Sequence, residues 1–382
     1  MRGVSRHVRP TPLWLLVLAA VVESWHVPAL IARTPSNDLQ GSIVYMSGTA
    51  DGGAQTTQRA IKAGPLKQES VLLSTGVCME TLSQQPASRS EKRSKPLPPL
   101  LFVHGSYHAA WCWAEHWMPF LAARGYDTHA ISLRGTSGSP LPEIEGKKTP
   151  RSVKVAEHVA DIEGFISQVL PGRKPVVIAH SFGGLVLMKA MEAMATRQEE
   201  EGSGSDHTRP ALAGAVFLCS VPPSGNGPMT GRFIKEKPVA ALKIVLGFVF
   251  KMAVSWPWLA KDLFFTQSLD KAALHRYMQN YRADSKVGLD LGDLRRQLPS
   301  KRADAEGRAD WLHLAPPRMV AGGERDYIVD SMGVAETAEF LGVDPIVLPN
   351  VPHGLMLGDW WPRGVDRLLI WLEEADLDVP AI

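Results

Sequence analysis

One ten-residue stretch constrains the fold of this chain more than any other. Residues 175–184 read Pro-Val-Val-Ile-Ala-His-Ser-Phe-Gly-Gly, an apolar strand that runs directly into a helix-like segment at 185–195. A tight strand-to-helix turn needs small residues two positions before and two after its serine, because larger side chains would collide there. Ala179 and Gly183 meet that need. The pattern predicts a nucleophile elbow with Ser181 at its apex, and a plain turn in which the serine caps the helix is the alternative.

The chain downstream carries the acid and the base that an acyl-transferring serine requires. A predicted strand and glycine turn lead to several acids, of which we expect Asp326 to orient the base. Glu324 and Asp330 are the alternatives, and Asp330 is placed to cap the next helix. His353 follows the last predicted strand, 345–349. Serine, acid and histidine therefore fall in this order at the carboxyl ends of successive strands, where open α/β sheets bind their ligands.

A second glycine-containing turn supplies backbone N–H groups that could stabilise a developing oxyanion. Residues 99–106 form an apolar strand that ends in His-Gly-Ser. We expect the backbone N–H of Ser106 to pair with that of Phe182 as an oxyanion hole. Gly105 would let the backbone approach a substrate carbonyl closely. His104 is expected to hold this loop in place by hydrogen bonding and to take no part in the chemistry.

Several motifs together resemble a known family. The run 104–113, His-Gly-Ser-Tyr-His-Ala-Ala-Trp-Cys-Trp, precedes Leu-Arg-Gly at 133–135, the elbow, and Gly-Leu-Met directly after His353. These motifs resemble the α/β-hydrolases, in particular the subgroup that holds plant methylesterases, hydroxynitrile lyases and lysophospholipase-like esterases. The resemblance extends over residues 97–375, and the insertion at 224–312 is only loosely matched.

The resemblance has consequences for the site and for the reaction. It implies that Ser181, Asp326 and His353 form a catalytic triad. It also implies that the backbone amides of Ser106 and Phe182 form the oxyanion hole. The lyases carry a threonine where this chain has Gly105, and a lysine where it has Gly354. Dehalogenases and epoxide hydrolases of this fold use an aspartate nucleophile in place of Ser181. Hydrolysis of an ester, a thioester or an amide is therefore the expected class of reaction, and a carboxylic ester is the substrate that we expect.

The alternation of strands and helices predicts an α/β fold with a doubly wound, mostly parallel sheet over residues 68–382. Residues 153–170 have apolar positions at helical spacing and should lie on the sheet. Residues 224–312 are an insertion where a helical lid is expected, with 15 Lys and Arg against 9 Asp and Glu. Its apolar stretch 239–258 is expected either to pack over the catalytic domain or to give peripheral contact with an anionic membrane.

The N-terminal region has the pattern of a targeting sequence. Residues 1–24 combine arginines with an apolar core at 13–22 that is too short to span a bilayer, which predicts a signal peptide. Residues 25–67 are transit-like or disordered. Together they resemble a bipartite plastid presequence, with plain secretion and a disordered tail as alternatives. The 3 cysteines show no paired spacing, which favours a reducing compartment and therefore the plastid.

Composition excludes other classes of function. The net charge is +2, and no basic run is interleaved with aromatic residues, so a nucleic-acid partner is not expected. No zinc-like spacing is present, and we expect neither a metal nor a cofactor. The sequence predicts a serine esterase that acts on a lipid-like or small apolar ester, with its oligomeric state open. The alternative is a small-ligand-binding protein that keeps the fold without turnover.

Overall fold

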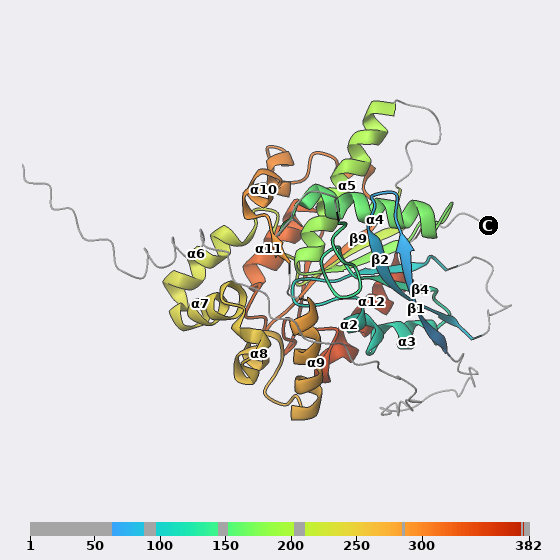
Figure 1. The fold of residues 1–382 in the computed structure, drawn as a ribbon. Helices are drawn as coiled ribbons and strands as arrows, with labels where there is room; N and C mark the ends of the chain where they lie inside the picture. Colours follow the sequence, from blue (N-terminus) through green and yellow to red (C-terminus); the bar gives the residue numbers. More distant parts are fainter. Residues whose placement is uncertain are drawn as a thin grey trace, which may run out of the picture. The chain divides into compact units, whose positions relative to one another are not determined.

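An eight-stranded β-sheet organises the computed structural model, which describes residues 63–87, 97–143, 152–201, 211–284, 287–375 and 377 (Figure 1). Its strands are β1 (Ala63–Leu72), β2 (Cys78–Pro86), β3 (Leu100–Val103), β4 (Thr128–Ile131), β6 (Val176–His180), β7 (Gly214–Leu218), β9 (Arg318–Gly323) and β10 (Pro345–Leu348). They are ordered β1-β2-β4-β3-β6-β7-β9-β10. β2 pairs antiparallel with β1 and β4, and the other pairs are parallel. The predicted doubly wound, mostly parallel sheet is confirmed.

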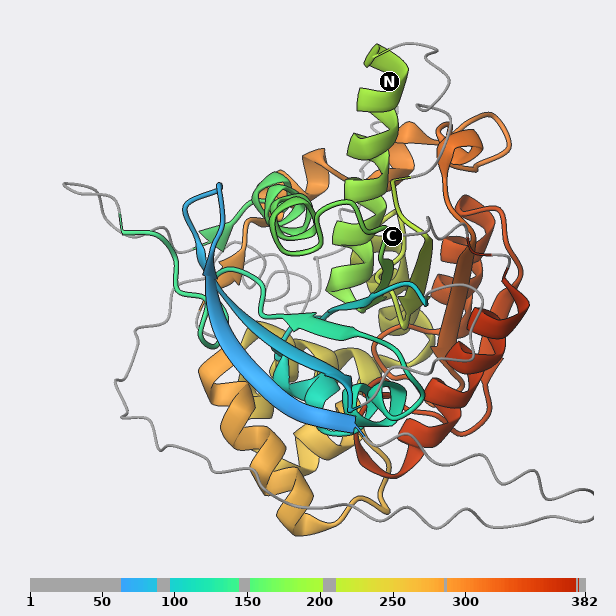
Figure 2. The same cartoon turned by 90° about the vertical axis from the view of Figure 1, so that its right-hand side faces the viewer.

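Helices cover both faces of this sheet (Figures 1 and 2). Their bounds are α2 (Trp111–Ala114), α3 (Trp117–Ala122), α4 (Val155–Val169), α5 (Phe182–Glu201), α11 (Ser331–Phe340) and α12 (Trp361–Glu374). α4 and α5 lie side by side on one face, and α3 and α12 lie on the other. α4 falls within the span predicted for a helix, 153–170, and buries one face against the sheet because its apolar residues recur at helical spacing.

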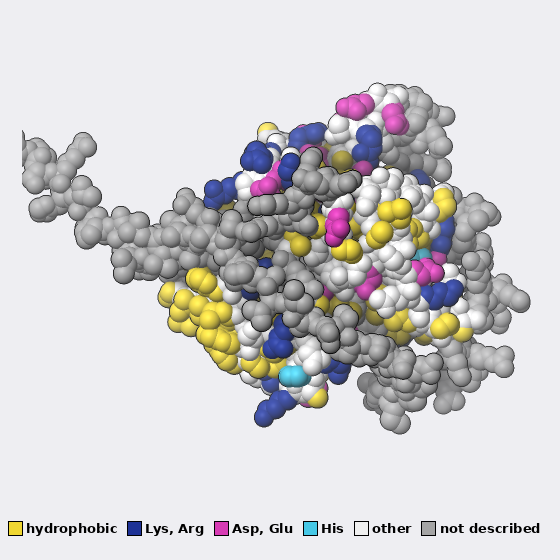
Figure 3. Space-filling view, viewed as in Figure 1, with side chains coloured by type: hydrophobic (Ala, Val, Ile, Leu, Met, Phe, Trp, Pro, Cys, Tyr) yellow, Lys and Arg dark blue, Asp and Glu magenta, His cyan; other side chains and the backbone are white. Residues whose placement is uncertain are grey.

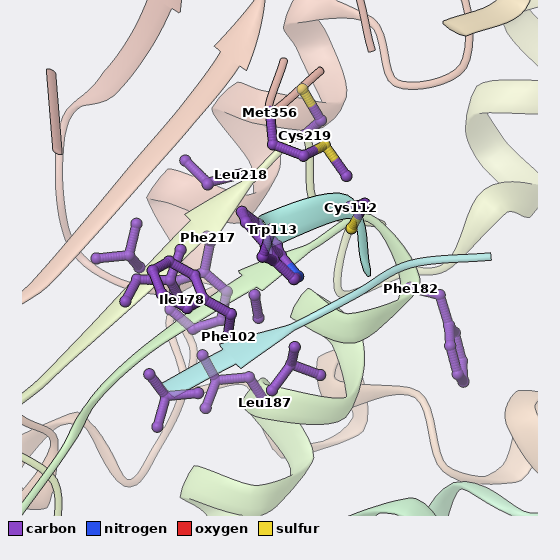
Figure 4. Close-up of a cluster of buried hydrophobic side chains, with 14 of the residues drawn as sticks. Phe102, Cys112, Trp113, Ile178, Phe182, Leu187, Phe217, Leu218, Cys219 and Met356 are labelled. Carbon is purple, nitrogen blue, oxygen red and sulfur yellow. The ribbon is translucent and has the colours of Figure 1, made fainter. Parts of the chain in front are cut away.

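The core fixes the strands whose ends carry the candidate site. Figure 4 shows Phe102 of β3, Ile178 of β6 and Phe217 of β7 gathered around Trp113. All four side chains are fully buried, and the rings of Phe102 and Trp113 stack with centroids 4.9 Å apart. Burial of one such side chain stabilises the fold by about 2–3 kcal/mol. The loops that follow β3, β6 and β7 therefore start from a rigid base.

The insertion between β7 and β9 contains many short elements. They are α6 (Asn226–Glu236), α7 (Pro238–Ile244), the π-helical turn η1 (Val245–Val249), η2 (Met252–Val254), α8 (Pro257–Phe264), α9 (Lys271–Asp284), β8 (Gly288–Leu289), α10 (Leu291–Arg296), η3 (Pro299–Arg302) and η4 (Leu312–Leu314). The apolar stretch 239–258 is divided among several of them. It is interrupted at Lys251, whose φ of 53° is left-handed, and Pro257 begins a new helix. A short strand β5 (Ser152–Val153) pairs with β8.

Strand β1 begins before residue 68, where the sequence predicts the start of the domain. β1 starts at Ala63, and residues 63–67 pair with the end of β2. The side-chain amide of Gln84 also donates to the carbonyl of Gly64 at 2.9 Å, which fixes the start of the strand. The predicted signal peptide at 1–24 and most of the transit-like segment lie outside the described residues. Among the described helices, none has the length and apolar character needed to cross a membrane.

Candidate active site

The turn between β6 and α5 has the strained geometry that its sequence predicts. Ser181 has a φ of 53°, a left-handed conformation that is unfavourable for a residue with a side chain. Its backbone is held in place because its N–H donates to Leu218 at 3.0 Å and its carbonyl accepts from Gly184 and Val221 at 3.0 and 3.1 Å. α5 begins at the next residue, Phe182. The serine is thus presented at the apex of a rigid strand-to-helix turn.

Small residues allow this turn to lie directly against the loop that follows β3. A Cβ on Gly105 would lie 2.6 Å from the Cβ of Ser181, and one on Gly183 would lie 2.5 Å from the carbonyl oxygen of His104. Ala179, two residues before the serine, is fully buried in β6 opposite Val103 of β3. The predicted need for small residues therefore has a concrete cause, which is contact between two neighbouring backbones.

We expect Gly183→Ala to lower the free energy of unfolding by about 1–3 kcal/mol, because its methyl group would overlap the backbone of the neighbouring loop. Gly231→Ala is the matched control, since nothing lies within 4 Å of the position of its Cβ in α6. That substitution should be neutral or slightly stabilising, because alanine favours a helix over glycine. Urea unfolding of both variants measures the difference. Equal effects at the two positions would contradict the close approach.

An acid and a base meet on the loops that follow β9 and β10. The Nδ1 of His353 lies 2.7 Å from the Oδ2 of Asp326, and both side chains are buried. The other carboxylate oxygen of Asp326 accepts the backbone N–H groups of Ile328 and Val329 at 2.7 and 2.8 Å. Since a carboxylate only accepts, His353 donates from Nδ1, and its Nε2 keeps the lone pair that a general base needs. The carbonyl of His353 accepts from the ring of His180 at 2.9 Å.

The two alternative acids have other partners. Glu324 accepts the backbone N–H of Asn350 at 2.9 Å on the surface. Asp330 caps α11 by accepting the N–H of Gly333 at 2.8 Å, as the sequence predicts, and it also pairs with Arg232 at 2.8 Å. The structure thus brings Asp326 to the histidine and directs the other two acids elsewhere.

His104 holds the loop that carries the predicted oxyanion donor Ser106. Its Nδ1 donates to the carbonyl of Gly105 at 2.8 Å, and its Nε2 accepts the N–H of Leu133 at 2.8 Å. Burial lowers the pKa of His104 to about 4, so the ring stays neutral and keeps this pattern of bonds. Phe182 is the first residue of the long helix α5, where backbone N–H groups have no intrahelical partner and the helix dipole favours an anion.

Two further residues adjoin the site and were missed from the sequence. Cys219 lies at the end of β7 with a φ of 46°, and its buried thiol is hydrogen-bonded to Asp326. Burial, and next the charge of Asp326, raise the pKa of that thiol, which keeps it protonated as a donor. His180, Cys219 and His353 have possible ligand atoms within 4.8 Å of one another. Because Cys219 bonds to Asp326 and the ring of His180 bonds to the carbonyl of His353, we assign the cluster to support of the acid–base pair.

The lid closes over this arrangement. The ring of Phe264, at the end of α8, lies 6.1 Å from that of His353, and its carbonyl accepts the N–H of Gly354 at 2.8 Å. A Cβ on Gly354 would lie 2.7 Å from the same carbonyl oxygen, so glycine is required there. On the other side, the hydroxyl of Tyr107 donates to the carbonyl of Gly247 at 2.6 Å. Ser181 itself is 5% exposed in this closed arrangement.

Three buried histidines should make the protein less stable as the solution is acidified. Burial lowers the pKa of His104 to about 4 and those of His108 and His158 to about 3, from 6.5. Below 6.5 the unfolded chain therefore binds protons that the folded chain does not bind. Between pH 6.5 and its folded pKa, each ring should lower the free energy of unfolding by up to about 1.4 kcal/mol for every pH unit of acidification.

Urea unfolding at neutral and mildly acidic pH measures this dependence of stability on pH. His158→Gln should reduce it, whereas the same change at the exposed His275 should leave it unaltered.

Comparisons with known proteins agree with the observed fold. Residues 100–363 match the model of the Alpha/beta hydrolase family. Norfluorocurarine synthase 1 from a Strychnos species is 28% identical over 130 residues, 34% of this chain and 40% of that protein. Methyl jasmonate esterase 1 from Vitis vinifera is 30% identical over 104 residues, 27% and 35% of the two chains. Methylesterase 1 from Arabidopsis thaliana is 33% identical over 93 residues, 24% and 33%. The chain thus spans two fifths or less of the length of these relatives.

Solved structures show the same fold over more of the chain. An esterase from Thermogutta terrifontis aligns with a TM-score of 0.51 and 16% identity, covering 81% of this chain and 99% of that one. An epoxide hydrolase from Solanum tuberosum aligns with a TM-score of 0.52 and 16% identity, covering 81% and 100%. At this identity the likeness shows the fold alone, which enzymes of different chemistry share.

Proposed function

This chain belongs to the alpha/beta hydrolase family, and on that premise we propose that it hydrolyses a carboxylic ester through an acyl-enzyme on Ser181. The observation that carries the proposal is the buried pair of His353 and Asp326, 2.7 Å apart, beside a serine held in a strained elbow. The similarity to methylesterases and to a methyl jasmonate esterase supports an ester as the substrate. A serine at the elbow favours acyl transfer over the aspartate-based chemistry of epoxide hydrolases.

The proposed reaction proceeds in two stages. The Nε2 of His353 takes the proton of the Ser181 hydroxyl as the oxygen attacks the ester carbonyl carbon, and the backbone N–H groups of Ser106 and Phe182 stabilise the resulting oxyanion. The intermediate collapses to an acyl-enzyme as His353 returns the proton to the departing alcohol. Water then attacks the acyl group by the same route, and a carboxylic acid leaves. Asp326 remains ionised and stabilises the imidazolium that forms in each stage.

A group of aromatic side chains near the base favours an apolar substrate. Phe264 lies against His353, and its ring is 5.2 Å from that of Tyr281 and 5.7 Å from that of Tyr107. Phe248 of the lid completes this aromatic group, 5.1 Å from Tyr107. Such walls suit an ester with an apolar acyl or alcohol part and offer little to a charged one. We propose a small apolar or lipid-like ester on this ground.

Covalent labelling tests the proposal directly. The folded full chain, treated with a fluorophosphonate and digested, should carry the label on the peptide that contains Ser181. A series of p-nitrophenyl esters of rising acyl length should then give a rate optimum, which separates a lipid esterase from a small-ester enzyme. Folded protein that binds a small apolar ligand but takes no label and turns over no ester would instead indicate the binding protein.

A further inference from the structure

Large hydrophobic side chains gather on the outside of the lid. Five such side chains within residues 239–258 are exposed: Val239 at 67%, Leu242 at 57%, Phe250 and Trp258 at 50%, and Trp256 at 37%. Figure 3 shows hydrophobic side chains clustered over α7 and α8. We call these five residues the lid patch. A concentration of apolar side chains on one surface segment indicates an interaction site, whereas scattered ones would not.

The lid patch is the outer side of the element that covers the candidate site. On α8, Leu263 and Phe264 are buried and the ring of Phe264 lies near His353, whereas Trp258 of the same helix is half exposed. The indole rings of Trp256 and Trp258 lie together, with centroids 5.7 Å apart. The sequence left two possibilities for this stretch, which are packing over the catalytic domain and contact with a membrane. The structure buries one face of the stretch as core and leaves the other face exposed.

Positive charge surrounds the lid patch. Residues 235–262 contain five lysines against two acids, Glu236 and Asp262. Lys235 and Lys237 are exposed beside the start of α7. At the edge of the patch, Lys243 pairs with Asp262 at 2.7 Å, and Lys261 donates to a backbone carbonyl of the lid at 2.8 Å. Tryptophan together with lysine is the combination that favours the interface of a bilayer with anionic head groups.

We propose that the lid patch docks on the surface of an anionic phospholipid bilayer. The tryptophans and the neighbouring apolar side chains enter the head-group region, and the lysines face lipid phosphates. A second copy of this chain is the less suitable occupant, because two lid patches brought face to face would repel through their excess of lysine. If the proposed function holds, docking places the helix that covers His353 at the bilayer, where an apolar ester would be found.

A local probe tests the contact, because the apolar N-terminal stretch at 13–22 could itself bind vesicles. An environment-sensitive NBD dye is attached to the full chain in a Cys78→Ser background, at Leu242→Cys in one sample and at Ile370→Cys in the other. Ile370 is 46% exposed on α12 and serves as the matched position. With vesicles that contain phosphatidylglycerol, the emission should shift to the blue at position 242 and stay unchanged at 370. Vesicles of phosphatidylcholine alone should give a much weaker shift.

Substitutions give the second measurement. Lys235→Gln with Lys237→Gln should weaken binding to phosphatidylglycerol vesicles by about tenfold or more, since each basic residue near such a surface contributes about 1 kcal/mol. Trp256→Ser with Trp258→Ser should also weaken it, whereas Met332→Ser with Ile370→Ser, which removes exposed apolar side chains elsewhere, should not. Hydrolysis of soluble p-nitrophenyl acetate should be unchanged in all three variants.

The outcomes separate this proposal from the enzymatic one. Loss of vesicle binding in the lid variants with normal turnover of the soluble ester supports both. A chain without turnover whose position 242 still senses anionic vesicles supports docking and contradicts the proposed function. Equal shifts at positions 242 and 370, equal binding to both kinds of vesicle, or a shift at 242 that depends on protein concentration without lipid would overturn docking. The last result would point to a second copy as the occupant.

Discussion

Replacement of Ser181 by alanine should abolish fluorophosphonate labelling and lower ester turnover by about four to six orders of magnitude. The hydroxyl is the atom that becomes acylated in the proposed reaction, and no neighbouring group can substitute for it. The thiol of Cys219 is the other nucleophile near the base. It is buried behind Asp326 with a raised pKa, so it stays protonated and unreactive. Initial rates with a p-nitrophenyl ester, and gel detection of the label, measure both effects.

Ser106→Ala is the matched control for that experiment. The proposed role of Ser106 uses its backbone N–H, which alanine retains, so labelling should persist and turnover should stay within about tenfold of the unmodified chain. Circular dichroism of each variant should match that of the unmodified chain. If Ser181→Ala were folded and still turned over ester at an unreduced rate, the acyl-enzyme mechanism would be wrong.

The elbow could be predicted because its serine and its small residues at 179 and 183 lie within one turn of chain. The contact that makes Gly183 necessary, with the carbonyl of His104 in a distant loop, was supplied only by the structure. The cap at Asp330 was predictable for the same reason, since it bonds to a backbone N–H only three residues away. Features that depend on neighbours in the chain leave a readable pattern.

Features that depend on distant segments leave a weaker pattern. Cys219, after β7, contacts Asp326, after the neighbouring strand β9, and nothing in the sequence around the cysteine indicates that neighbour. Residues 63–67, which precede the predicted domain boundary, become a strand only by pairing with β2. The stretch 239–258 has one composition but two environments, which are decided by what α8 packs against. Tertiary contacts determine each of these outcomes, and propensity determines none of them.

The choice among the three acids lies between features fixed by nearby residues and features fixed by distant contacts. Glu324, Asp326 and Asp330 lie within one loop, and spacing alone leaves each able to approach His353. The loop backbone decides the matter, because the N–H groups of Ile328 and Val329 bind one oxygen of Asp326 and aim the other at the imidazole. The choice depends on loop dihedrals, which the sequence does not state.

Asp326→Asn should lower kcat for ester hydrolysis by about 10⁴-fold while the fold is retained. The amide oxygen of the asparagine can still accept from Ile328 and Val329, so its NH₂ group is turned toward the Nδ1 of His353. An imidazole nitrogen that receives a hydrogen bond cannot carry a proton, and the ring is forced into the tautomer protonated on Nε2. That nitrogen then has no lone pair with which to take the proton of Ser181. Single-turnover kinetics with a p-nitrophenyl ester measures the loss.

Two matched substitutions make this result specific to one carboxylate. Glu324→Gln alters a surface contact with Asn350 and should leave kcat within a few-fold of the unmodified chain. Asp330→Asn removes the charge that pairs with Arg232 and weakens the cap of α11, so it should cost about 1 kcal/mol of stability with little change in kcat. The expected order is therefore a large loss at 326 and small effects at 324 and 330. A loss of similar size at either control position would assign the orienting acid to that residue and overturn the role of Asp326.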